Sequence, residues 1–321
     1  MTIMRCCRSL LWTAALLAVF AAVSPSGAAR TFKVGTWKTA QTIQPFFYAD
    51  FLPPEDQVEV FPFTNPADQK TALLAGSLDM CGTTIAHAIH SAALGQPVVV
   101  VAALCSKCSA LVVKNDGTFS AVPDLKGKKI GYVPGTMHEI LLRETLTRHH
   151  LSPATDVALV RIDFFDMGLA LARGGIDAFL SGEPFPTIAV QEGYGRILSY
   201  PYYDESIGTI NAGMLVTRKM IEADPEAVFR LVQAHAAATR HLAAHPSIWL
   251  SRAASFGTPL KTLEAAAGNM ALAWEMDDAF VEKVKALGQR MAALGVITRQ
   301  PDYDSLIDLT FVERLRTAEQ P

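Results

Sequence analysis

Residues 174–185 read Gly-Gly-Ile-Asp-Ala-Phe-Leu-Ser-Gly-Glu-Pro-Phe, and this stretch decides the fold class. The glycines end a helical segment, Ala-Phe-Leu-Ser predicts a short buried strand, and Gly-Glu-Pro-Phe predicts a tight loop after it. Residues 72–84 show the same order of helix end, buried strand and small polar loop. Strands that alternate with helical segments in this way are typical of a parallel sheet with crossover helices. The sequence therefore predicts an α/β fold.

The alternating pattern extends on both sides of these stretches and forms two groups of strands. The chain passes between the groups near residues 109–114 and again near residues 209–217, and beyond residue 217 it reads as helical. We therefore expect two doubly wound α/β lobes joined by a two-strand hinge, with a cleft at the crossing and a helical C-terminal region. The expected boundaries are residues 30–110 and 214–321 for lobe I and residues 111–213 for lobe II.

Residues 1–29 predict a secretory signal peptide. Arg5 and Arg8 precede an apolar run over residues 10–23, and small residues around Ala29 suit cleavage by a signal peptidase. The run is too short to cross the roughly 30 Å hydrocarbon core of a bilayer. We therefore expect an exported protein, with a retained membrane anchor as the alternative.

Composition limits the remaining classes of protein. Half of the 321 residues are hydrophobic and 18% are charged, which excludes a disordered chain and a coiled coil. The formal net charge is −3, from 28 basic and 31 acidic side chains. A chain without a basic stripe does not fit a nucleic-acid-binding protein. We therefore expect no nucleic-acid partner.

Three stretches carry a family resemblance: Phe32-Lys-Val-Gly-Thr-Trp37, Ala72-Leu-Leu-Ala-Gly-Ser-Leu-Asp79 and residues 174–185. They resemble the solute-binding proteins of ABC importers, most closely the SsuA/THI5-like (NMT1/TauA) family, which takes up sulfonates, nitrate-type ions or thiamine-precursor pyrimidines. The resemblance implies a type II periplasmic binding protein, usually a monomer, that closes on a small molecule. It also implies delivery of that molecule to an ABC permease and ATPase in the inner membrane. Because such families vary their loops on a shared scaffold, the resemblance does not identify the ligand.

Loops at the carboxyl ends of the predicted strands supply the expected ligand-binding residues, because ligands of doubly wound sheets bind there. Glu183 is the strongest candidate, since two prolines follow it closely and restrict the loop. A fixed carboxylate favours amine, amidine or ring N–H groups and repels anions. We therefore expect a nitrogen-containing, pyrimidine-like solute, with a sulfonate or nitrate as the alternative. The expected ligand-binding residues are Trp37, Thr39, Gln41, Thr83, Thr84, Ser109, Thr136, His138, Glu183 and Phe185.

Each of these residues also has a structural alternative. Thr83, Thr84 and Thr136 precede predicted helices, where a threonine hydroxyl caps free backbone N–H groups. Trp37 could instead pack in the core, and Glu183 could be a solvated loop acid.

Cys105-Ser-Lys-Cys108 is the least expected motif of the chain. A disulfide between Cys105 and Cys108 fits an oxidising compartment, and small packing thiols are the alternative. Cys81 ends a neighbouring predicted strand and could join them. A soft-metal site would need further thiolate or imidazole ligands at suitable spacing, so no metal is expected.

The leading hypothesis is a binding protein that performs no chemistry and needs no cofactor. The sequence contains no Gly-x-Ser-x-Gly elbow, phosphate loop or His-Glu-x-x-His motif. The alternatives are a THI5-like pyrimidine-forming enzyme and a binding protein that reports its ligand to a membrane receptor.

Overall fold

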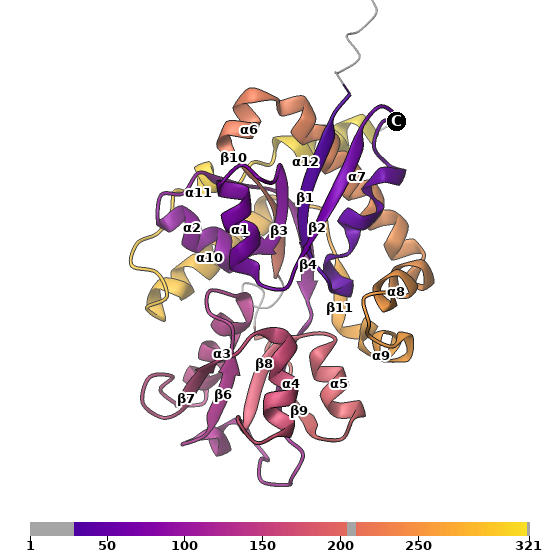
Figure 1. Cartoon of the computed structure of the whole chain (residues 1–321). Helices are drawn as coiled ribbons and strands as arrows, with labels where there is room; N and C mark the ends of the chain where they lie inside the picture. Colours follow the sequence, from indigo (N-terminus) through magenta and orange to yellow (C-terminus); the bar gives the residue numbers. More distant parts are fainter. Residues whose placement is uncertain (1–28, 204–209, 320–321) are drawn as a thin grey trace, which may run out of the picture.

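The computed structural model describes residues 29–203 and 210–319 and has two lobes, each built on one β-sheet (Figure 1). The predicted signal peptide lies outside the described residues, apart from Ala29. The larger lobe has a six-stranded sheet in the order β11-β4-β10-β3-β1-β2. Its strands are β1 (Thr31–Trp37), β2 (Gln57–Phe63), β3 (Met80–Thr84), β4 (Val98–Lys107), β10 (Ala212–Thr217) and β11 (Met270–Leu272).

The smaller lobe has a five-stranded sheet in the order β7-β6-β8-β5-β9. Strand β6 pairs in parallel with β7 and β8, whereas β5 runs antiparallel to β8 and β9. The strands are β5 (Ser109–Lys114), β6 (Lys129–Tyr132), β7 (Ala158–Arg161), β8 (Ala178–Gly182) and β9 (Gly195–Ser199). This is the predicted α/β architecture, with mixed rather than wholly parallel sheets.

Helices cover both sheets. Every residue of β4 from Val98 to Cys105 is buried, as expected of a strand covered on both faces. The helices of the larger lobe are α1 (Pro66–Leu74), α2 (Ile85–Ala93), α6 (Arg218–Ala223), α7 (Pro225–Ala244), α8 (Pro246–Ala254), α9 (Leu260–Ala266), α10 (Asp278–Ala293), α11 (Tyr303–Leu306) and α12 (Thr310–Glu319). Those of the smaller lobe are α3 (Met137–Arg148), α4 (Phe164–Ala172) and α5 (Phe185–Gln191).

Two short 3-10 helices follow β1, at Ala40–Thr42 (η1) and Gln44–Asp50 (η2). The segment is short and packs against α7, so tertiary contacts rather than helix propensity fix its conformation.

The chain crosses between the lobes twice. The first crossing is abrupt, because β4 ends at Lys107 and β5 begins at Ser109. Lys107 and Cys108 both adopt positive φ angles, of 60° and 74°. The second crossing follows β9, and the larger sheet resumes with β10 at Ala212. Residues 204–209, between β9 and β10, lie outside the described part of the chain.

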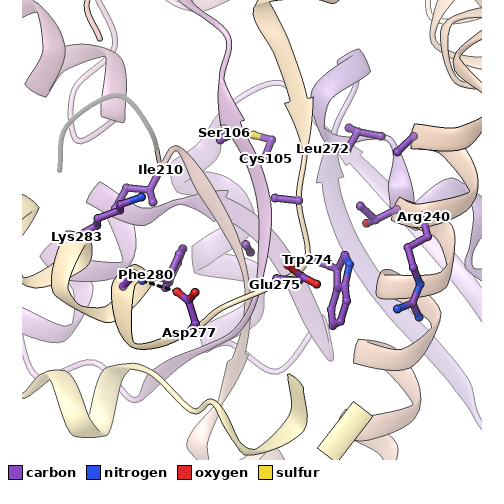
Figure 2. A pocket seen from close by; sticks show the side chains of 15 residues that line it. Cys105, Ser106, Ile210, Arg240, Leu272, Trp274, Glu275, Asp277, Phe280 and Lys283 are labelled. Atoms are coloured by element: carbon purple, nitrogen blue, oxygen red, sulfur yellow. Dashed lines mark hydrogen bonds between the residues drawn. The ribbon is translucent and has the colours of Figure 1, made fainter. Parts of the chain in front are cut away.

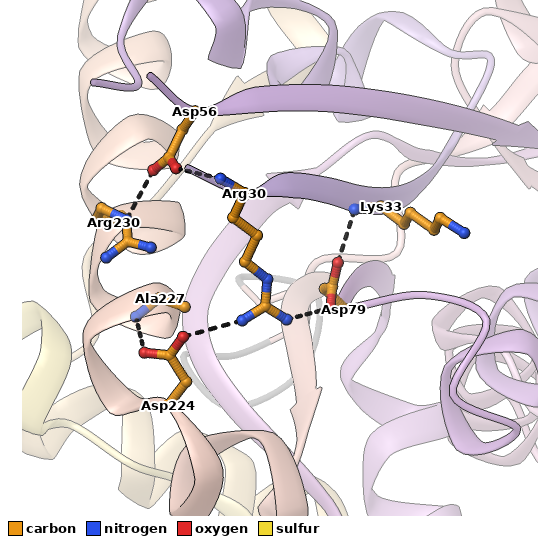
Figure 3. A network of polar contacts seen from close by, with 7 residues as sticks. All are labelled: Arg30, Lys33, Asp56, Asp79, Asp224, Ala227 and Arg230. Atoms are coloured by element: carbon orange, nitrogen blue, oxygen red, sulfur yellow. Dashed lines mark hydrogen bonds and ion pairs between the residues drawn. The ribbon is translucent and has the colours of Figure 1, made fainter. Parts of the chain in front are cut away.

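A charged network fastens the start of β1 to the rest of the larger lobe (Figure 3). The guanidinium of Arg30 contacts Asp79 at 2.7 Å and Asp224 at 3.1 Å. Asp56 accepts from the Arg30 backbone at 3.0 Å and from Arg230 Nε at 2.7 Å. Because these residues come from β1, α7 and the segments beside β2 and β3, the network joins segments that are distant in the sequence.

None of the helices in the described ranges is long and apolar enough for a membrane span.

Candidate functional site

A narrow crevice lies between the lobes at the carboxyl ends of β1 and β8. Its volume is about 20 Å³, which is room for a single water molecule. The lobes are therefore closed around it. The larger lobe contributes Trp37, Thr39, Gln41 and Thr64, and the smaller lobe contributes His138, Phe164, Phe165, Gly182, Glu183 and Phe185.

The structure brings together six of the residues expected to bind ligand, namely Trp37, Thr39, Gln41, His138, Glu183 and Phe185. Two buried polar atoms in this group have no hydrogen-bond partner among the described residues. They are Nε1 of Trp37, which is a donor, and Oε1 of Gln41, which is an acceptor. Phe165 and Phe185 meet edge to face, with ring centroids 5.0 Å apart. Aromatic rings thus line the crevice, and two of its lining residues each carry a buried polar atom without a hydrogen-bond partner among the described residues.

Glu183 is held at four points and is only 1% exposed. Its backbone N–H donates to the carbonyl of Cys108 at 2.8 Å, and its own carbonyl accepts from Gln41 Nε2 at 2.9 Å. In the side chain, Oε1 accepts from Asn269 Nδ2 at 3.1 Å and Oε2 accepts from the Thr187 backbone at 3.2 Å. Burial raises the pKa of the carboxyl above its usual value. The acid is fixed as expected, but it is already partnered.

The side chain of Glu183 also lines a second, wider space, which we call the outer chamber. It has a volume of about 390 Å³ and is lined by Lys107, Glu183, Thr187, Tyr200, Tyr202, Ala265, Gly268 and Asn269. The Tyr202 hydroxyl contacts Asn269 Oδ1 at 2.6 Å and accepts from the Ser109 backbone at 2.8 Å. Glu183 is therefore shared between the closed crevice and an open chamber.

Sequence reasoning missed Asn269, Tyr200 and Tyr202. Asn269 ends the 3-10 helix η4 (Ala267–Asn269), far from the predicted strand-end loops. The tyrosines belong to Tyr200-Pro-Tyr-Tyr203, directly after β9. Their clustering just before the second crossing was the one signal in the sequence that could have identified them.

His138 lines the crevice and contacts the ring of Phe164, and Ser109 contacts His138 in turn. The Ser109 hydroxyl is 3.0 Å from His138 Nδ1, and Phe164 meets the imidazole edge to face at 5.2 Å. Burial lowers the pKa of His138 to about 4, so the ring is neutral near pH 7. Ser109 does not line the crevice but supports a residue that does.

Thr83, Thr84 and Thr136 are not among the residues that line the crevice. Thr84 accepts from the His87 backbone at 3.2 Å, and Thr136 accepts from the Glu139 backbone at 3.3 Å. Thr83 is fully buried, and its hydroxyl is 3.4 Å from His87 Nδ1. Thr84 and Thr136 are therefore helix caps, which is the structural alternative given above. A contact of these residues with the solute stays a prediction.

The cysteine motif contains no disulfide. Cys81, Cys105 and Cys108 are all free and buried thiols. Cys105 is in β4 and Cys108 directly follows that strand, and the neighbouring Cys105 thiol raises the pKa of the Cys108 thiol. Burial raises the pKa of Cys81 to about 12. Within residues 29–203 and 210–319, three or more His, Cys, Asp or Glu side chains never gather in a way that could hold a metal ion.

A cavity of about 520 Å³ lies within the larger lobe (Figure 2). It is lined by Cys105 and Ser106 from β4, by Arg240 from α7, and by Trp274 and Lys283 on the C-terminal side, among others. The Arg240 guanidinium lies over the Trp274 ring, 4.8 Å from its centroid. None of the ten residues expected to bind ligand lines this cavity, so size alone does not identify the site.

Further contacts hold the lobes together outside the crevice. Arg290 of α10 pairs with Glu144 of α3, and Thr262 of α9 donates to the side chain of Gln191 at 2.6 Å. Both contacts join the larger lobe to the smaller one.

The fold is similar to that of solved binding proteins. SsuA of Xanthomonas axonopodis pv. citri, an alkanesulfonate-binding protein solved with MOPS, superposes with a TM-score of 0.76 at 19% identity, covering 87% of this chain and 98% of that one. The nitrate-binding protein NrtA of Synechocystis PCC 6803 gives a TM-score of 0.74 at 16% identity, covering 90% and 89%. At these identities the likeness shows the fold alone, which is that of the type II periplasmic binding proteins.

Sequence comparison finds an enzyme among the relatives of this chain. The chain is 32% identical over 131 residues to a 4-amino-5-hydroxymethyl-2-methylpyrimidine phosphate synthase of Saccharomyces cerevisiae. That match covers 40% of this chain and 38% of the yeast protein, well under two thirds of its length. The family model described as NMT1/THI5 like matches residues 57–248. Since this match spans more than half of the 321 residues, the chain belongs to the NMT1/THI5 like family.

Proposed function

We propose that this protein is the periplasmic solute-binding component of an ABC importer and holds a small nitrogen-containing ring between its lobes. Two buried polar atoms of crevice-lining residues, one donor and one acceptor, carry this proposal. Buried polar atoms are satisfied in the great majority of cases, and Trp37 Nε1 and Gln41 Oε1 are not. A solute that offers one acceptor and one donor completes this pair.

An amino-substituted heterocycle such as a pyrimidine has the required chemistry. A ring nitrogen accepts from Trp37, and an amino group donates to Gln41. The rings of Trp37, Phe165 and Phe185 offer faces and edges to a flat solute. Glu183 disfavours the alternative ligands, because burying a sulfonate or nitrate beside a carboxylate adds electrostatic repulsion.

Binding requires the lobes to separate first, because the closed crevice has room for one water only. The solute then stabilises closure through contacts with both lobes, and only such a difference in affinity shifts the open and closed populations. Thr39, His138 and Phe185 complete the proposed contacts, while Thr83, Thr84, Ser109 and Thr136 support the surrounding loops. We propose that a monomer in this closed form delivers the solute to the permease and ATPase.

Calorimetric titration of the purified protein tests this assignment. The probes are 4-amino-5-hydroxymethyl-2-methylpyrimidine, an alkanesulfonate and nitrate, and the expected result is saturable binding of the pyrimidine with a raised Tm. Glu183→Gln is expected to weaken binding about tenfold or more, because it removes the charge that strengthens the hydrogen bond from Asn269 across the closed lobes, and a hydrogen bond to a charged group contributes about 1.5–3 kcal/mol.

The matched control is Glu192→Gln, which changes an exposed acid of the same lobe and should leave binding unchanged. Binding of the sulfonate or nitrate in place of the pyrimidine would contradict the ligand class. Equal binding by the wild type and Glu183→Gln would remove Glu183 from the site.

The similarity to the yeast pyrimidine phosphate synthase favours a second candidate, a pyrimidine-forming enzyme. A binding protein returns its solute unchanged, whereas an enzyme consumes substrate and releases product. Mass spectrometry of the small molecules separates the two after prolonged incubation of the protein with a metabolite extract from which pyrimidines have been removed. We expect no pyrimidine to appear, and a pyrimidine formed in proportion to the protein would establish the enzyme instead.

A further inference from the structure

Two free thiols lie together at the first crossing between the lobes. Cys105 is near the end of β4, and Cys108 is the single residue between β4 and β5. The neighbouring Cys105 thiol raises the pKa of the Cys108 thiol, so the two side chains interact. The residues between them are Ser106 and Lys107. A bond between the two sulfurs would therefore close a small ring around the crossing itself.

The backbone of this crossing has an unusual conformation. Lys107 and Cys108 both adopt left-handed φ angles, of 60° and 74°. Residues other than glycine rarely adopt this left-handed φ region, because their Cβ atom comes close to the following carbonyl oxygen. Two such residues in succession persist only where surrounding contacts hold them.

The contacts that hold Cys108 come from both lobes and from both crossings. Asn211, at the second crossing, donates to the carbonyl of Lys107 at 2.8 Å and to the Cys108 sulfur at 3.4 Å. The Cys108 carbonyl accepts from the backbone of Glu183 at 2.8 Å. Cys108 thus connects the two crossings to the loop that carries the proposed ligand-binding acid.

Cys105 borders a cavity of the larger lobe. Cys105 and its neighbour Ser106 line the cavity of about 520 Å³, beside Ile210 and Leu272 (Figure 2). This cavity is separate from the crevice and shares none of its lining residues. The side of the crossing that carries Cys105 therefore faces a space that does not belong to the proposed solute site.

We propose that Cys105 and Cys108 form a dithiol modification site, at which a small disulfide oxidises the pair to an intramolecular disulfide and fixes the crossing in its closed-lobe conformation. Nothing in this step involves the solute. The site takes thiol-reactive disulfides of the glutathione type as its co-reactant.

The reaction balances as a thiol–disulfide exchange. The Cys105 thiolate attacks one sulfur of the external disulfide, forms a mixed disulfide and releases one small thiolate. The Cys108 thiol then loses its proton and attacks the Cys105 sulfur, which releases the second small thiolate. The protein loses two hydrogens, and the external disulfide is reduced to two thiols. Cys105 lines the cavity and Cys108 does not, which assigns the first attack to Cys105.

Oxidation restricts the hinge because lobe opening changes backbone angles at the crossing. A ring through Cys105, Ser106, Lys107 and Cys108 limits those changes. The oxidised protein is therefore expected to remain closed, whereas the reduced protein opens and closes.

The test treats the purified protein with glutathione disulfide or with dithiothreitol, alkylates the remaining thiols after denaturation, and maps the peptides by mass spectrometry. After oxidation, the peptide that contains residues 105 and 108 should be unalkylated and lighter by two hydrogens, and dithiothreitol should restore alkylation. Cys105→Ser should abolish the mass loss. Cys81→Ser is the control, since it removes the third buried thiol and should leave the bridge intact.

Small-angle scattering of the two samples tests the hinge. The oxidised protein should have the smaller radius of gyration. Alkylation of both Cys105 and Cys108 after oxidation, a bridge to Cys81, or equal radii would overturn the proposal. Reversible oxidation of the unaltered chain tests the proposed disulfide even where a variant fails to fold. Because no solute is added, the outcome is independent of the function proposed above.

Discussion

The amide of Asn269 lies 3.1 Å from the carboxyl of Glu183 and donates a hydrogen bond to it across the interface between the lobes. The acid that was expected to await a solute is therefore already satisfied by the opposite lobe. In this position Glu183 links closure to recognition, because opening the lobes breaks the contact and frees the carboxyl.

Asn269→Ala tests this link. The substitution leaves Oε1 of a buried carboxyl without a partner in the closed protein, which costs about 1–3 kcal/mol. We expect a lower free energy of unfolding and a larger radius of gyration from small-angle scattering. Asn115→Ala is the control, since Asn115 donates to Gly193 on the exposed surface of the smaller lobe. Unchanged stability and size in Asn269→Ala would show that the contact does not hold the lobes.

Trp37→Phe separates binding from stability. The phenyl ring keeps an aromatic wall but removes the Nε1–H, which has no partner among the described residues. We expect the pyrimidine to bind about tenfold more weakly, a loss of about 1.4 kcal/mol, while the Tm of the free protein stays unchanged. Trp274→Phe, outside the crevice, should leave the dissociation constant as it is. A matching loss of binding in both variants would point to an indirect effect.

Stability is expected to fall as the pH drops from about 6.5 toward about 4. Burial lowers the pKa of His87, His138 and His235 to about 4, whereas an unfolded histidine has a pKa near 6.5. Between these values the unfolded chain binds more protons than the folded one, so stability rises with pH. Each histidine accounts for about 2 kcal/mol between pH 6.5 and about pH 5.

Urea unfolding at several pH values measures this slope. His138→Gln should reduce the slope of stability against pH by roughly one third, because one of the three buried histidines is removed. His149→Gln, at an exposed position, should leave the slope unchanged. A flat profile for the wild type over this range would mean that the three histidines are not buried in their neutral form.

The sequence identified the parts of the site that depend on strand ends. Trp37 ends β1 and Glu183 follows β8, and the position of a loop after a parallel strand is a local property that the hydrophobic pattern reveals. Asn269 could not be found in this way. It reaches Glu183 from the end of η4, and that approach depends on how the C-terminal helices pack across the lobe interface.

Thr84 and Thr136 show a second limit. Their positions before helices were predicted correctly, but the same hydroxyl can cap a helix or contact a solute. Only the hydrogen bonds to the backbones of His87 and Glu139 distinguish the two roles. The closed crevice is a further property of packing, because volume follows from how two lobes meet and leaves no local pattern.

Arg230→Ala should destabilise the larger lobe at the network of Figure 3. Arg230 pairs with Asp56 at 2.7 Å, and the Asp56 side chain is only 2% exposed. Removing one partner of a buried ion pair costs about 3 kcal/mol, because the other charge is left without compensation. Urea unfolding is the measurement. Lys285→Ala, which breaks an exposed pair with Glu282, should have no measurable effect, and a similar loss in both variants would contradict the argument.

Gly135→Ala is expected to force the lobes apart. Gly135 has a φ of +74°, and an added Cβ would lie 2.5 Å from Nε2 of His87 on the opposite lobe. Gly117 has a similar φ of +79° but open space around it, so Gly117→Ala measures the backbone cost alone, about 1–2 kcal/mol. The clash with a buried ring adds about 1–3 kcal/mol at Gly135. Because opening the lobes relieves that clash, Gly135→Ala should also enlarge the radius of gyration, and Gly117→Ala should not. Equal losses of stability with equal radii would mean that His87 yields without moving the lobes.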